Sequence, residues 1–178
     1  AESDDTIAAV GAKLLYPANT IQHAGVILGI RGRPFHGQRE LPQTSDGYCG
    51  RANALQEYSV VTAALVLLRR DAYLHVRGFD SQMFPTSYND VDLCLRLRQA
   101  GYRCIYNPSV QAYHFESKTR GRSPLEEEYC RRLAERWPKH VNYDSFYNPN
   151  LSSRHAFRTD FRQVSSEELA ARPQAAKA

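Results

Sequence analysis

The stretch that constrains the fold most is residues 88–121, which read YNDVDLCLRLRQAGYRCIYNPSVQAYHFESKTRG. Its first part has apolar residues at helical spacing, with Asn89 as a candidate N-cap and Gly101 just past the last turn. Asp90 shares one face of this helix with the apolar residues three, four and seven positions later. We therefore expect a helix between Asn89 and Gly101 with Asp90 as its inward-facing acid.

Asp92 points to the other side of this helix and has Arg96 four residues later, which predicts a solvated ion pair. Residues 90–92 also form a literal Asp-x-Asp, a pattern associated with metal-bound nucleotide sugars. Carboxylates two positions apart on a helix point nearly opposite ways and do not converge on one cation. Asp90 by itself is then either a catalytic proton acceptor or an ordinary acid of a first helical turn.

The residues after this helix predict two short strands and a basic loop. Residues 102–106 have strand composition, Asn107 and Pro108 predict a turn, and a second strand leads to His114. A histidine at a strand end is either a structural side chain or a ligand. The loop that follows contains three cations, two hydroxyls and a glycine, so it either binds a diphosphate or is an ordinary solvated loop.

Several further motifs follow one another in a fixed order along most of the chain. They are VGAKLLYP (10–17), TIQHAGV (20–26), VTAA (61–64), GFD (78–80), YNDVDLCLR (88–96), AGYR (100–103) and YNPNLS (147–152), with Pro108, His114 and Asp144 between them. This ordered set resembles the C-terminal half of family-2 inverting glycosyltransferases of the GT-A fold. It is similar to the rhamnosyltransferase-like enzymes of bacterial polysaccharide biosynthesis.

The resemblance implies a role for each matching residue. Asp90 corresponds to the general base that deprotonates the acceptor hydroxyl, and His114 to a histidine that contacts the divalent metal or the diphosphate. The basic loop corresponds to one that closes over the donor, which makes its three cations phosphate contacts: Lys118, Arg120 and Arg122. The implied cofactor is Mg²⁺ or Mn²⁺, and the implied donor is a nucleotide-diphosphate sugar.

The resemblance also implies a fold, a reaction and a location. We expect an α/β fold, a mixed β-sheet flanked by helices, as the acceptor-side portion of a GT-A fold over residues 1–152. From its polar composition, we expect residues 153–178 to be a tail that is partly flexible or forms a short helix. The implied reaction moves a sugar to a glycan or lipid-linked acceptor with inversion. It takes place in the cytoplasm at the inner face of the membrane, with peripheral membrane association of the parent protein.

Departures from the family pattern support a second hypothesis. Asn89 stands where the family commonly has Glu, and Ser81 follows Gly78-Phe79-Asp80 where the family commonly has another Glu. No nucleotide-binding half with its own Asp-x-Asp precedes these motifs, so we expect a fragment that is inactive alone. We also expect a homodimer, formed through the surface that the missing half would otherwise cover. The alternative is a non-catalytic module, derived from a degenerate transferase domain, that binds glycan or a partner.

Composition agrees with one globular core. The 178 residues are 42% hydrophobic and 24% charged, and the net charge of +4 is too small and its arginines too scattered to predict a nucleic-acid partner. The longest apolar run, residues 60–68, is far shorter than a membrane span. The four cysteines have no Cys-x-x-Cys spacing, so we expect buried thiols rather than a zinc site.

The remaining segments give coarser expectations. Residues 7–16, 21–29 and 57–68 have strand composition, and a capping box at residues 123–126 predicts a helix to about Trp137. The long segment 31–57 is punctuated by Gly and Pro. Three of its side chains are either sugar contacts or plain loop packing, namely Tyr48, Arg51 and Asn53.

Overall fold

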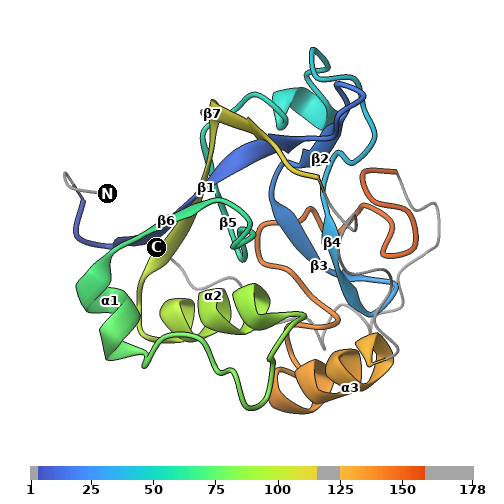
Figure 1. Cartoon of the computed structure of the whole chain (residues 1–178). Helices are drawn as coiled ribbons and strands as arrows, with labels where there is room; N and C mark the ends of the chain where they lie inside the picture. The colour runs from blue at the N-terminus through green and yellow to red at the C-terminus, as the bar shows by residue number, and fades with distance from the viewer. Residues whose placement is uncertain (1–3, 116–124, 159–178) are drawn as a thin grey trace.

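The computed structural model describes residues 4–115 and 125–158, which form a mixed α/β fold (Figure 1). Its strands are β1 (Ile7–Leu15), β2 (Ile21–His23), β3 (Val26–Ile30), β4 (Arg33–His36), β5 (Gln56–Tyr58), β6 (Val66–Leu68) and β7 (Arg103–Tyr113). Its helices are α1 (Arg70–His75), α2 (Asn89–Gln99) and α3 (Glu126–Arg136), with a short 3₁₀ turn at Tyr48–Gly50. The expected class, a mixed sheet with helices, is confirmed.

Strand β1 is the centre of the main sheet, whose order is β2-β1-β7-β5. It pairs in parallel with β7, and antiparallel with β6 and β2 along its length. Almost every residue of β1 is buried, which explains its nearly continuous apolar sequence. Strands β3 and β4 form a separate hairpin, and Figure 1 shows the three helices along the opposite side of the molecule from β2.

A lysine lies in the middle of this apolar strand. Lys13 is buried, and its ammonium donates to the backbone oxygen of Gln43 and to Oδ1 of Asn53, both at 2.9 Å. Burial lowers the pKa of Lys13 because it disfavours the charged form. The two acceptors satisfy the ammonium and fix the segment that precedes β5 against the sheet.

The strand expected over residues 21–29 is in fact two strands in different sheets. The strand is interrupted at Gly25, whose φ of +86° favours glycine over any residue with a side chain. A Cβ there would lie 2.4 Å from Cζ of Tyr58, so the ring of Tyr58 also requires glycine. The break sends β2 to the main sheet and lets β3 pair with β4.

The single strand expected over residues 57–68 is wrong as well. Residues 56–58 and 66–68 are strands β5 and β6, and the segment between them has only one isolated bridge, from Val60 to Val26. The β-branched residues Val60, Val61 and Thr62 are buried in tertiary contacts rather than in a ladder. An apolar run of this length does not distinguish the two situations.

The turn expected at Asn107 and Pro108 is absent, because β7 runs continuously from Arg103 to Tyr113. The pairing is irregular at the proline: Ala12 of β1 pairs with Asn107 and Lys13 pairs with Gln111, so residues 108–110 have no partner in β1. The strand therefore ends just before His114, whose backbone N–H donates to the oxygen of Leu15 at 2.8 Å.

Helix α2 begins one residue earlier than a cap at Asn89 would place it. Tyr88 is the N-cap, and the side-chain oxygen of Asn89 accepts the backbone N–H of Asp90 at 2.8 Å. Gly101 follows the helix with a φ of +90°, as its place after the last turn predicts.

Asp92 pairs with Arg96 at 2.8 Å as expected, but the pair is not solvated. The carboxylate is fully buried because α3 covers that side of α2. It also meets the guanidinium of Arg136 at 3.1 Å and the indole N–H of Trp137 at 3.0 Å. Asp92 is thus a structural acid that joins α2 to α3.

None of the helices in the described ranges is long and apolar enough to cross a bilayer.

Candidate functional site

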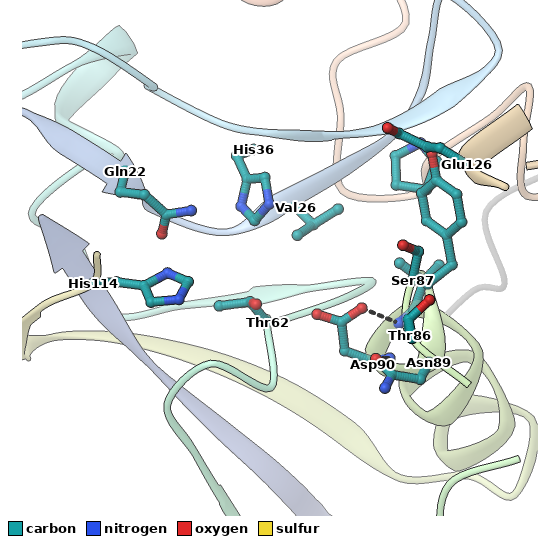
Figure 2. Close-up of a pocket in the computed structure, with 13 residues that line it drawn as sticks. Gln22, Val26, His36, Thr62, Thr86, Ser87, Asn89, Asp90, His114 and Glu126 are labelled. Atoms are coloured by element: carbon teal, nitrogen blue, oxygen red, sulfur yellow. Dashed lines mark hydrogen bonds between the residues drawn. The ribbon is translucent and has the colours of Figure 1, made fainter. Parts of the chain in front are cut away.

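A pocket of about 280 Å³ opens between α2, the β3–β4 hairpin and the end of β7. Figure 2 shows that its polar side chains gather at two ends. We call one end, formed by Gln22, His36 and His114, the histidine end. The other end, formed by Ser87, Asp90 and Glu126, is called the acid end. Thr62 lies between them, and the remaining lining residues are Val26, Pro34, Thr86, Tyr88, Asn89 and Val91.

Asp90 is half-buried and held by two backbone donors. Its Oδ1 accepts the N–H of Val91 at 2.9 Å, and its Oδ2 accepts the N–H of Ala63 at 3.1 Å. The first donor belongs to α2 and the second to the segment between β5 and β6. The carboxylate is therefore fixed in orientation and lines the pocket, a position in which an acid can meet a ligand hydroxyl.

The backbone beside this acid is strained. Tyr88 adopts a left-handed conformation, with φ of 60° and ψ of 11°, although it has a bulky side chain. Such a conformation costs about 1–3 kcal/mol. Seven other non-glycine residues in the described ranges also have positive φ, and Tyr88 is the one among them that lines this pocket. Burial, followed by the neighbouring Cys130 and Glu126, raises the pKa of the Tyr88 hydroxyl, so this group stays a neutral donor near pH 7.

His114 reaches the same pocket from the far side, just beyond β7. Its Nδ1 is buried and has no hydrogen-bond partner in the described residues. An unsatisfied buried nitrogen is costly, so this atom is a candidate ligand-binding position. Within residues 4–115 and 125–158, no group of three or more His, Cys, Asp or Glu side chains is arranged to hold a metal.

One further histidine, His23, contacts His36 of the histidine end and does not itself line the pocket. His23 of β2 is fully buried, and its Nδ1 lies 2.9 Å from Nδ1 of His36 at the end of β4. The two rings are nearly perpendicular, with centroids 5.1 Å apart. Burial, His36 and His114 together lower the pKa of His23 well below 6.5, so it is neutral.

The three cations expected to contact phosphate lie outside the described residues: Lys118, Arg120 and Arg122. The candidate sugar contacts of segment 31–57 do not line the pocket. The ring of Tyr48 stacks on Phe157, the guanidinium of Arg51 lies over the Tyr58 ring, and Asn53 binds Lys13. Each of these three side chains thus has a partner within the described residues.

Sequence reasoning missed six of the polar residues that line the pocket: Gln22, His36, Thr62, Thr86, Ser87 and Glu126. Gln22 and Thr62 fall inside motifs that carried the family resemblance, which was the available signal. Glu126 had been interpreted only as part of a capping box. Nothing in the sequence distinguished His36 from its neighbours, because the β3–β4 pairing brings it to the pocket.

Three relatives are known proteins with substantial identity. The chain is 39% identical over 152 residues to an uncharacterized protein of Sinorhizobium fredii, a match that takes in 82% of this chain and 17% of that protein. It is 33% identical over 156 residues to the O-antigen biosynthesis protein RfbC of Myxococcus xanthus, and this match takes in 82% of the chain and 12% of RfbC. It is 38% identical over 64 residues to an N-acetylglucosaminyl-diphospho-decaprenol L-rhamnosyltransferase of Mycobacterium tuberculosis. This match takes in 36% of the chain and 20% of that protein.

The names of these relatives suggest a glycosyltransferase family. The chain spans less than a fifth of the length of the two relatives with the longest matches. No family model matches the chain. No solved structure matches it either.

Proposed function

We propose that the protein containing this chain is a family-2, GT-A glycosyltransferase that works with inversion, and that this chain is its acceptor-side, C-terminal portion. The sugar moves from a nucleotide-diphosphate donor to a glycan or lipid-linked acceptor. The observation that carries the proposal is the oriented carboxylate of Asp90 on a pocket shared with His114. The relatives' names support the reaction class.

Asp90 is the proposed general base. A sugar hydroxyl is a poor nucleophile, so its attack on the donor carbon requires a group that removes its proton. Backbone donors hold both carboxylate oxygens of Asp90, which fixes the direction in which this acid can accept a proton. The strained backbone of Tyr88, directly before α2, is consistent with a functional position.

The histidine end is the proposed place of the donor's diphosphate and its Mg²⁺ or Mn²⁺. Among the described residues, His114 offers one ligand atom, the buried Nδ1 without a partner. A single nitrogen does not make a complete site for a hard cation, so diphosphate oxygens and water would supply the other positions. The metal would neutralise charge on the leaving diphosphate. Lys118, Arg120 and Arg122 are proposed as further phosphate contacts.

The proposed location is the cytoplasm at the inner face of the membrane, where a lipid-linked acceptor would be presented.

The decisive variant is Asp90→Asn in the full-length protein. We expect turnover of nucleotide sugar to fall by about 10²–10⁴-fold while donor binding is retained, because the variant removes only the proton acceptor.

Asp71→Asn is the matched control for this experiment. Asp71 also lies in the first turn of a helix, and its Oδ1 accepts the next N–H, that of Ala72, at 2.8 Å. It is exposed and does not line the pocket. We expect this variant to keep normal turnover. Equal activity of both variants would show that Asp90 is an ordinary first-turn acid, and an inactive wild-type protein would support the non-catalytic module.

A further inference from the structure

The hydrogen bonds of His23 and His36 fix where the protons of the two imidazole rings lie. The contact between Nδ1 of His23 and Nδ1 of His36, at 2.9 Å, requires one nitrogen to donate and the other to accept. The geometry of this pair does not by itself decide which is which. The other ring nitrogen of His23 decides it.

That nitrogen, Nε2 of His23, accepts the backbone N–H of Gly25 at 3.3 Å. A ring nitrogen can accept a hydrogen bond only when it carries no proton. His23 therefore has its single proton on Nδ1. The complete burial of His23 agrees with a neutral ring, because a charged imidazolium would be desolvated there.

The proton on Nδ1 of His23 points at Nδ1 of His36, which must accept it. His36 consequently carries its own proton on Nε2. Unlike His23, His36 is only half-buried and lines the pocket at its histidine end. Whichever group Nε2 of His36 meets, it meets that group as a donor.

We propose that His23 is a positioning residue that holds His36 as a neutral Nε2–H donor toward an anionic ligand group in the pocket. The part that concerns the ligand rests on the proposed function, in which the donor's diphosphate occupies the histidine end. A neutral donor stabilises negative charge on phosphate oxygens without competing with Asp90 for a proton. The pocket then has a donor at one end and a proton acceptor at the other.

The first experiment determines the tautomers by ¹⁵N NMR of the protein labelled at histidine. Protonated and bare ring nitrogens resonate far apart, and the chain has only six histidines. A His36→Gln variant assigns the signals of His36. We expect a proton on Nδ1 of His23 and on Nε2 of His36. A bare Nε2 on His36 would overturn the proposal.

Two variants of His23 separate positioning from packing. In His23→Asn, the side-chain amide can still donate to Nδ1 of His36, whereas His23→Leu has no donor. We expect His36 to keep its tautomer in the Asn variant and to lose it in the Leu variant. In the full-length enzyme, KM for the donor should rise about tenfold for Leu and remain within about threefold of wild type for Asn, with kcat little changed.

A melt followed by circular dichroism establishes that both variants are folded. The same tautomer and the same KM in both would reduce His23 to a packing residue. Inorganic pyrophosphate, added without metal, is the ligand probe and should shift the Nε2 signal of His36 but not the signals of the exposed His75. An unmoved His36 signal would refute its role toward the anion. Failure of the glycosyltransferase assignment itself is detected separately by Asp90→Asn.

Discussion

The carboxylate of Asp92 and the guanidinium of Arg136 meet at 3.1 Å in the interior, between α2 and α3. Arg96 and the indole of Trp137 complete the surroundings of this carboxylate. Every oxygen of Asp92 therefore has a partner, although no part of its side chain reaches solvent. Removing such a charge leaves cations and a donor without their partner.

We expect Asp92→Ala to lower the free energy of unfolding by about 3–5 kcal/mol, because the two arginines lose their buried counter-charge. Urea denaturation measures this loss. Glu135→Gln is the control, since Glu135 pairs with Arg131 on an exposed face of α3 and should contribute less than about 1 kcal/mol. Similar losses in both variants would contradict the structural role of Asp92.

Gly25→Ala should be much more destabilising than Gly32→Ala. Both glycines have positive φ, +86° and +70°, so both variants pay a backbone cost of about 1 kcal/mol. At Gly25 the new methyl group would also lie 2.4 Å from Cζ of Tyr58, whereas at Gly32 no atom lies within 4 Å. We expect a total of about 3 kcal/mol or more for Gly25→Ala by urea denaturation. Equal losses would mean that Tyr58 moves aside freely.

Glu57 should make stability depend on pH in the acid range. Burial alone would raise its pKa, but hydrogen bonds from Arg98 and Arg103, both at 2.8 Å, outweigh it and lower the pKa below the ordinary value of 4.5. The stabilisation is therefore present above about pH 4.5 and is lost as the pH falls through the lowered folded-state pKa.

The comparison of wild type with Glu57→Gln checks this dependence. At pH 7 the variant should be less stable, and the difference in free energy of unfolding should shrink as the pH falls below about 4.5. A difference that stays constant down to pH 3 would show that the arginines do not act through the charge of Glu57.

Asp144→Asn should weaken the contact between β3 and the segment near residue 144. The buried carboxylate of Asp144 accepts the N–H of Leu28 at 2.9 Å, the hydroxyl of Ser59 at 2.7 Å and the N–H of Phe146 at 2.9 Å. In the Asn variant, an NH₂ group replaces one of the two carboxylate oxygens. This donor then faces the N–H of Leu28 or of Phe146, which loses its acceptor. We expect a loss of about 2–3 kcal/mol, compared with about 1 kcal/mol for Ser59→Ala. Thermal or urea unfolding of both variants decides between these values.

Regular periodicity accounts for what the sequence predicted well. The apolar spacing of residues 91–97 indicated α2, and the continuous apolar run of β1 indicated a buried strand. The spacing also made Asp90 the inward-facing acid, whereas Asp90 is half-buried and the fully buried acid of α2 is Asp92. The six residues of α1 were not predicted, because they are too few to show a period. The interruption of 57–68 was missed because burial without strand pairing has the same apolar signature.

The site was predictable only in part, for a related reason. Helical and strand spacing left two interpretations open for Asp90 and for His114, and the family resemblance assigned both to a site. The structure brings both to one pocket, although their chemical roles stay predictions. His36 and Glu126 reach it through the β3–β4 hairpin and through α3, two tertiary arrangements that no local pattern specifies. The solvated state expected for Asp92 failed likewise, because α3 covers it from a distant part of the sequence.

The anchoring of α3 has a consequence for how the width of the pocket can change. Glu126, in the first turn of α3, forms one wall, while Asp90, in the first turn of α2, forms another. The two helices are held together at Asp92, which does not line the pocket. We expect substitutions at Arg136 or Trp137 to loosen this connection, and so to change the spacing of the two walls while every lining side chain stays unaltered.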